Sequence, residues 1–296
     1  MTSAPQPDTA VDAERGWLNV VGTGYRSVSD ITLEGRASIE QADQVFYLVT
    51  DPVTAGWIVE QNPRAENLQP LYRDKKPRVE SYSEMTERIL RPVRAGRFVT
   101  AAFYGHPGVF VAPSHAAIKQ AKKEGFSAHM LPAVSAEDWL FADLGLDPAS
   151  SGCQSFEATD FLVNQRQHDP TSLLILWQIG VIGALDFRWR YDYRANLAVL
   201  TETLLKEYPE EHQVAVYQIM PYAICTPWIR WVELRTLAEA EVTPSCTLVV
   251  PPRGRRVSDP EMLERLGMPL YSDSYRTVAR EGVAAGTEIP LSDGDS

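Results

Sequence analysis

The chain has 296 residues and a formal net charge of −11, and its 44% hydrophobic and 23% charged residues are typical of a soluble globular protein. The acidic balance argues against nucleic acid as the main partner. No apolar run reaches the roughly 18 residues that a membrane span requires. The first 15 residues lack the apolar core of a signal peptide, so we expect a cytoplasmic protein without membrane contact.

Short apolar strands alternate with helical segments in the first half of the chain. We expect strands at 17–21, 44–49, 67–71, 98–103 and 126–131, and helices at 31–42, 53–61, 113–123 and from residue 81 onward. The last of these helices carries Met85, Ile89 and Val93 at spacings of four, and Pro92 is expected to kink or end it. Such alternation predicts a parallel, doubly wound sheet.

The second half carries strands with fewer helices between them. We expect strands at 172–178, 213–219, 226–234 and 245–251, and a helix at 194–207. This order favours a second α/β domain with antiparallel pairs. The expected organisation is a disordered lead (1–15), an N-terminal α/β domain (16–131), a C-terminal α/β domain (132–252) and a polar tail (253–296) with one short helix at 261–266.

Two tyrosines and an arginine lie close together in the sequence. Tyr72, Arg78 and Tyr82 fall within 11 residues, and we expect a loop between the tyrosines. A guanidinium favours the phenolate form of a neighbouring tyrosine, and a phenolate held away from water is a strong general base. Such a set could remove a proton from a very weak acid. On spacing alone, however, a loop with one surface arginine and two half-buried tyrosines is the favoured interpretation.

The strand expected at 98–103 ends abruptly at Tyr104-Gly105-His106-Pro107-Gly108. A parallel strand that stops at such a turn places it at the carboxyl edge of the sheet, where open α/β sheets bind ligands. Gly22-Thr23-Gly24 follows the first strand in the same way, although it lacks the rest of a dinucleotide-binding fingerprint. His106 has no second histidine or carboxylate at ligand spacing, and the three cysteines match no metal motif, so we expect no metal site.

These turns resemble those of the tetrapyrrole methylase superfamily, whose members use S-adenosylmethionine. The blocks that carry the resemblance to this superfamily are Gly22–Gly24, Tyr104–Phe110 and Pro132–Ala136. Within the superfamily the sequence is similar to the borosin family, the peptide backbone α-N-methyltransferases. That second similarity runs through Asn67–Tyr72, Ala101–Phe110, Glu124–Ala128, Ala142–Pro148 and Gln154–Ala158. The resemblance as a whole covers roughly residues 17 to 252.

The resemblance implies a homodimer of two-domain α/β subunits with S-adenosylmethionine in the cleft between the domains. It also implies a catalytic set of Tyr72, Arg78 and Tyr82, with Tyr104 near the cofactor. The turns that contact the cofactor match Gly22, Gly24, Tyr104, Gly105, His106, Pro107, Gly108, Val109, Phe110, Ser135 and Ala136. Trp177, Gln178 and Tyr217 match cofactor-binding positions less specifically.

Fungal members of that family carry an apolar core peptide fused at the carboxyl end. About 44 residues follow Pro252 here, without a run rich in valine, isoleucine and glycine. We therefore expect the split bacterial type, which methylates the backbone amides of a separate precursor peptide, rather than self-methylation at Val283–Gly286. Two alternatives on the same fold are a tetrapyrrole C-methyltransferase and a non-catalytic peptide-binding subunit.

Overall fold

The computed structural model describes residues 16–254 and 258–268. The expectations for the lead at 1–15 and for Val283–Gly286 concern residues outside these ranges. The described chain packs as two compact units. The first combines residues 16–136 with two later segments, Leu185–Arg188 and Pro221–Cys225, and the second holds the remainder.

The first unit contains a sheet of five parallel strands. Their order is β3 (Ala65–Asn67), β2 (Gln44–Leu48), β4 (Phe98–Phe103), β1 (Trp17–Gly22) and β5 (Ser127–Leu131). In the central pair Gly22 lies opposite Phe103, so β1 and β4 end level with one another. The chain leaves β1 toward β2 and leaves β4 toward β5, in opposite directions along the sheet. The expected parallel sheet is confirmed.

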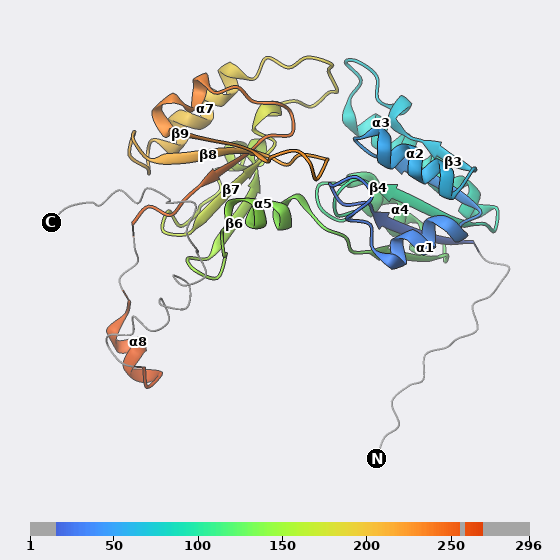
Figure 1. Cartoon of the computed structure of the whole chain (residues 1–296), viewed down its shortest axis with the longest axis horizontal. Coiled ribbons are helices and arrows are strands. Elements are labelled where there is room, and N and C mark those ends of the chain that lie inside the picture. Colours follow the sequence, from blue (N-terminus) through green and yellow to red (C-terminus); the bar gives the residue numbers. More distant parts are fainter. Residues whose placement is uncertain (1–15, 255–257, 269–296) are drawn as a thin grey trace. The chain divides into compact units, whose positions relative to one another are not determined.

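Helices cover both faces of this sheet (Figure 1). The helices are α1 (Leu33–Gln41) and α2 (Pro52–Gln61) on one face, and α3 (Arg78–Arg94) and α4 (Ala112–Lys123) on the other. The alternation of a strand's side chains explains this arrangement. On β4, Ala102 packs with α1 and α2, whereas Ala101 and Phe103 pack with α3 and α4.

Two local expectations for the first unit are wrong. The strand expected at 67–71 ends at Asn67, and a 3₁₀ turn, η1 (Gln69–Leu71), follows it. Pro70 lies in this turn and has no N–H to give to a strand neighbour. The helix expected from residue 81 begins at Arg78, whose N–H donates to the Leu185 carbonyl, and it continues past Pro92 to Arg94.

The second unit contains a mixed five-stranded sheet. Its order is β6 (Cys153–Glu157), β7 (Leu173–Trp177), β10 (Thr247–Val250), β8 (Gln213–Gln218) and β9 (Trp228–Glu233). The pair β6–β7 is parallel and the other pairs are antiparallel, as the sequence predicts for this half. The sequence analysis missed β6 and the short helix α6 (Ala158–Val163) that follows it.

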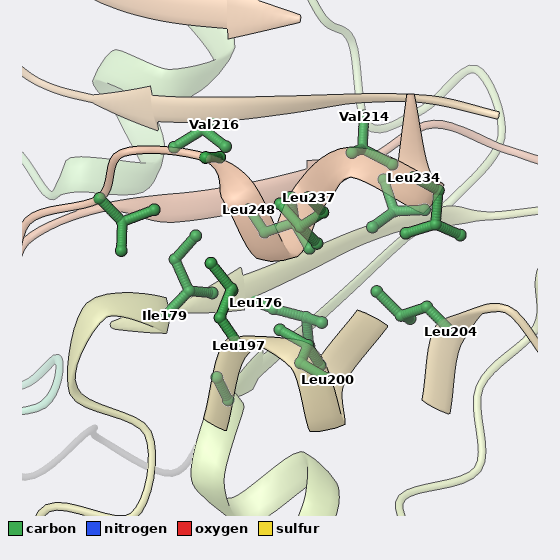
Figure 2. Close-up of a cluster of buried hydrophobic side chains, with 14 of the residues drawn as sticks. Leu176, Ile179, Leu197, Leu200, Leu204, Val214, Val216, Leu234, Leu237 and Leu248 are labelled. Carbon is green, nitrogen blue, oxygen red and sulfur yellow. The ribbon is translucent and has the colours of Figure 1, made fainter. Parts of the chain in front are cut away.

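One face of this sheet packs against α6, α7 (Arg194–Leu204) and a 3₁₀ segment, η3 (Leu234–Glu239). In Figure 2 leucines of α7 lie beside Leu176 and Leu248 in this core. The remaining described elements are α5 (Ala136–Leu144), the 3₁₀ turn η2 (Ile179–Val181) and α8 (Pro260–Arg265), which confirms the short helix expected at 261–266. Within the described ranges, the helices are all too short or too polar to cross a membrane.

Candidate active site

The loops that follow β1 and β4 are joined by backbone hydrogen bonds. Thr23 N donates to Phe103 O at 2.8 Å, and Gly105 N donates to Gly24 O at 2.8 Å. Gly24 and Gly105 form a bridge, and both have positive φ, +67° and +65°. Only glycine adopts this conformation without steric cost. The turns that follow β1 and β4 are therefore hydrogen-bonded to each other at the carboxyl edge of the sheet.

The packing around these turns shows why larger residues do not fit. A Cβ on Gly22 would lie 2.3 Å from Gly105 O and 2.5 Å from the Ala133 Cβ. A Cβ on Gly105 would lie 2.6 Å from Cε2 of Tyr25. The segment before α5, which contains the buried Ser135 and leads to Ala136, thus runs beside the end of β1. Protein atoms already fill the space around these glycines.

The turn after Gly105 is held by its own side chains. His106 Nδ1 accepts a hydrogen bond from Gly108 N at 3.0 Å, and the Ser114 hydroxyl donates to the Pro107 carbonyl. Val109 and Phe110 follow with 43% and 53% of their surface exposed. Phe110 has a φ of 55°, an uncommon conformation for a residue with a side chain. Exposed apolar surface on a strained turn is a candidate ligand contact.

A second group of contacts fixes the backbone beside Tyr72. The Leu71 carbonyl accepts hydrogen bonds from Lys76 Nζ and from Ser81 Oγ, each at 3.1 Å. Lys76 Nζ also lies 2.7 Å from Glu84 Oε2. Since Ser81 and Glu84 belong to α3, these contacts tie the loop at 71–77 to that helix.

A later segment of the chain pairs with the same loop. Lys75 N donates to Phe187 O at 2.7 Å, Phe187 N donates to Lys76 O at 3.0 Å, and Arg78 N donates to Leu185 O at 3.1 Å. We call Leu185–Arg188 the strap. The Phe187 ring stacks on the Tyr72 ring with centroids 5.2 Å apart and planes 25° apart.

The structure brings Tyr72, Arg78, Tyr82 and Tyr104 together within the first unit. Arg78 and Tyr82 are four residues apart on α3, so they lie on one face of that helix. The Tyr82 ring meets the Tyr72 ring edge-on, with centroids 6.3 Å apart. Tyr104 meets Tyr25 edge-on at 5.8 Å. Charge interactions link Tyr104 to both Tyr82 and Arg78.

Burial raises the pKa values of Tyr72 and Tyr104. The pKa of Tyr72 is raised above its ordinary value of 10, mainly by burial and then by the neighbouring Tyr82 and Tyr104, and Arg78 only partly offsets the rise. The pKa of Tyr104 is raised by burial and by Tyr82, again against Arg78. Arg78 lowers both pKa values, as expected of a guanidinium beside a phenol, but the loss of solvation outweighs that attraction.

One hydrogen bond joins the two members of the tyrosine pair. The bond between Tyr72 and Tyr82 raises the pKa of Tyr72, so it adds to the effect of burial in favouring the protonated form of Tyr72. Each phenol hydroxyl can donate or accept such a bond.

The remaining predicted residues, Trp177, Gln178 and Tyr217, lie in the second unit. The Trp177 indole N–H donates to Ser155 Oγ at 2.6 Å, and the Tyr217 hydroxyl donates to Asp143 Oδ2 at 2.8 Å. Gln178 follows β7 with a φ of 61°. The side chains of Trp177 and Tyr217 are buried and have hydrogen-bond partners inside their own unit.

Two aromatic residues of the site were missed by sequence reasoning. Tyr25 directly follows the Gly22-Thr23-Gly24 turn but was not considered as a site residue, and Phe187 lies far along the chain from the loop that it contacts. The pKa of Tyr25 is raised by burial and by Tyr104. An aromatic residue directly beside a turn glycine, as in Gly24-Tyr25 and Tyr104-Gly105, was the available signal for Tyr25. Across 16–254 and 258–268 no three His, Cys, Asp or Glu residues are grouped as metal ligands.

Curated relatives cover most of this chain. It is 41% identical over 260 residues to a methyltransferase/ribosomally synthesized cyclic peptide gymnopeptides precursor of Gymnopus fusipes, covering 86% of this chain and 61% of that protein. Over 262 residues it is 42% identical to the corresponding type I borosin cyclic peptide precursor of Mycena rosella, covering 86% and 64%. For the omphalotin A precursor of Omphalotus olearius, identity is 40% over 265 residues, covering 88% and 63%. The chain thus spans less than two thirds of the length of these relatives.

A solved structure shares the fold. The uroporphyrin-III-C-methyltransferase of Thermus thermophilus superposes with a TM-score of 0.57 over 80% of this chain and 92% of its own, at 19% identity. That likeness confirms the two-sheet α/β fold. The family profile described as Tetrapyrrole (Corrin/Porphyrin) Methylases matches residues 18–220. The chain therefore belongs to the tetrapyrrole (corrin/porphyrin) methylases.

Proposed function

We propose that this chain transfers methyl groups from S-adenosylmethionine to backbone amide nitrogens of a ribosomally made peptide, as a borosin-type enzyme. The observation that carries the proposal is the cluster of Tyr72, Tyr82, Arg78 and Tyr104 at the carboxyl edge of the first sheet. The names of the relatives, which combine a methyltransferase with a cyclic peptide precursor, support the same chemistry.

The carboxyl edge of the first sheet suits a sulfonium cofactor. Val109 and Phe110 expose apolar surface on the turn after β4, where α/β sheets bind ligands. Tyr104 precedes them in the same turn, and an aromatic face attracts a cation. Tyr104, Val109 and Phe110 would hold the cofactor there. When bound, S-adenosylmethionine supplies an electrophilic methyl group carried on positively charged sulfur.

The chain's own residues must make an amide nitrogen nucleophilic. Its lone pair is delocalised into the carbonyl group, so a neutral amide is a poor nucleophile. The protonated Tyr72 can donate a hydrogen bond to the amide oxygen as charge develops there. The Arg78 guanidinium stabilises that negative charge electrostatically.

We assign the base role to Tyr82. Its hydroxyl is hydrogen-bonded to Tyr72, and Arg78 lies on the same face of α3. In this proposal the Tyr82 oxygen takes the amide proton during methyl transfer, with the Arg78 charge beside it. Tyr72 and Tyr104 are poorly suited to this role because burial raises the pKa of each.

Mass spectrometry tests the proposal. The purified full chain is incubated with S-adenosylmethionine and candidate peptides taken from the gene neighbourhood, with uroporphyrinogen III as the competing substrate. Mass increases in multiples of one methyl group, located on backbone nitrogens by fragmentation, are the expected result. Methylation of the tetrapyrrole alone would replace the proposal with the C-methyltransferase alternative. Cofactor binding without any methylation would favour the non-catalytic alternative.

The homodimer and the separate precursor implied by the resemblance stay predictions. Light scattering on the purified chain measures the subunit number. Methylation of a peptide added as a separate molecule tests the prediction of a separate precursor. If methyl groups were found only on the protein chain itself, that prediction would be contradicted.

A further inference from the structure

We propose that Phe187 is a positioning residue that holds the Tyr72 hydroxyl in line with Tyr82. This inference rests on the proposed function for its kinetic consequence. Its structural part, that Phe187 sets the orientation of Tyr72, can be tested without any activity. The residues concerned all belong to the first unit.

The backbone of the strap is firmly placed. Three hydrogen bonds of 2.7 to 3.1 Å join residues 75–78 to residues 185–187, and Pro77 and Asp186 form a β-bridge. One of these bonds satisfies the N–H of Arg78, the first residue of α3. Since helix N-termini leave their first N–H groups without intrahelical partners, the strap completes the start of the helix that carries Arg78 and Tyr82.

The strap places one aromatic ring, that of Phe187, against Tyr72. Phe187 is half-buried and stacks on Tyr72, whereas its neighbour Leu185 points to solvent with 84% of its surface exposed. Tyr72 is therefore held by two rings in different geometries, the stacked Phe187 and the edge-on Tyr82. Aromatic pairs of these two geometries are favourable and directional.

This arrangement restricts how the Tyr72 ring can turn. The contacts of Leu71 with Lys76 and Ser81 fix the backbone beside Tyr72 but do not touch its ring. The Phe187 stack adds a restraint on the ring, beside the edge-on contact with Tyr82. The hydrogen bond to Tyr82 needs that orientation, and a small misplacement in a catalytic group can cost roughly 10²-fold in rate.

The kinetic test compares four single variants of the full chain. Phe187→Leu and Phe187→Met remove the flat ring but keep apolar volume, Phe187→Tyr keeps the ring, and Leu185→Ala changes an exposed strap residue as a control. Single-turnover methylation at saturating peptide and cofactor should fall roughly 10- to 100-fold in the first two variants. Phe187→Tyr and Leu185→Ala should stay near the wild-type rate, and cofactor affinity should not change in any of them.

A double-mutant cycle shows whether Phe187 acts through Tyr72. Adding Phe187→Leu to a Tyr72→Phe background should cause no further loss, because the hydroxyl that Phe187 positions is already absent. A full additional loss in that background would overturn the proposal and leave Phe187 with a general structural role. Equal losses in Leu185→Ala and Phe187→Leu would overturn it as well.

A spectroscopic arm separates this inference from the proposed function. With tyrosine labelled by ¹³C on the ring, the Tyr72 signal is assigned by its loss in Tyr72→Phe. Phe187→Leu or Phe187→Met should shift or broaden that signal through loss of the stacked ring, whereas Leu185→Ala should leave it in place. An unchanged Tyr72 signal would overturn the positioning role. Absence of methylation by the wild-type protein would refute the proposed function alone.

Discussion

Tyr72 and Tyr82 are joined by a hydrogen bond, and their rings stand nearly perpendicular, with an interplanar angle of 82°. The two residues come from different elements, one following η1 and the other in the first turns of α3. The proposed mechanism gives the two residues different roles. In it, Tyr72 keeps its proton and stabilises the amide oxygen, while the Tyr82 oxygen takes the amide proton.

Removing the acceptor oxygen should stop most turnover. Tyr82→Phe keeps the ring and its contacts with the core, so folding and cofactor affinity should survive. Loss of a positioned base lowers rates by about 10²–10⁴. Single-turnover methylation measures the effect, with the melting temperature and calorimetric cofactor binding as controls. A near wild-type rate would exclude Tyr82 as the base.

Arg78→Lys should also be strongly impaired. Lysine keeps the positive charge but loses the planar guanidinium, which can bind two oxygens at once. We expect turnover to fall about 10- to 100-fold if two such contacts form in the transition state. Each tenfold loss corresponds to about 1.36 kcal/mol in the activation free energy. The matched control is Arg88→Lys. Arg88 lies on the same helix as Arg78 and forms an exposed salt bridge with Glu66 of β3. Equal behaviour of the two variants would remove Arg78 from the mechanism.

Gly105→Val should destabilise the protein as well as weaken cofactor binding. A β-branched residue is strained at a φ of +65°, and its Cβ would clash with the Tyr25 ring. Such backbone strain costs about 1–3 kcal/mol before the clash is added. Gly56→Ala is the control, since nothing lies within 4 Å of that Cβ and alanine in α2 should stabilise by about 0.5–1 kcal/mol. Urea unfolding compares them, and an unchanged midpoint for Gly105→Val would contradict the packing argument.

Stability should decline as pH rises above about 10. Tyr25, Tyr72 and Tyr104 have raised pKa values in the folded protein, so the unfolded chain releases their protons first. Between the unfolded and folded pKa values the folded state binds more protons, and each such group removes about 1.4 kcal/mol per pH unit. Tyr25→Phe should therefore flatten the decline, as measured by denaturant unfolding between pH 9 and 11. The same slope in both proteins would show that Tyr25 is not the source.

Regular elements with strong apolar patterns could be predicted from the sequence. The apolar run of β4 and the stripe of Met85, Ile89 and Val93 on α3 are examples. In both elements the apolar positions in the sequence are the buried positions in the structure. By contrast β6 has no apolar run, because its residues are half-buried or exposed, and only its pairing with β7 identifies it as a strand.

The candidate site was only partly visible from the sequence. Tyr72, Arg78 and Tyr82 stand close together in the chain, so their grouping could be noticed. Phe187 could not be found this way because the strap is held by backbone hydrogen bonds, which leave no side-chain pattern. The raised pKa of Tyr72 could not be predicted either, since it depends mainly on burial in the folded protein.

The strap also sets an order of events during synthesis. Residues 16–136 emerge from the ribosome first and include the whole parallel sheet, so most of that unit can collapse early. The loop at 75–78 then waits for its backbone partners until residues 185–188 have been made. Contacts so distant in the chain are slow to form because loop closure must precede them. A nascent or truncated chain that stops after β5 therefore holds Tyr72 and Tyr82 without Phe187, which is added only after residues 137–184 of the second unit have been translated.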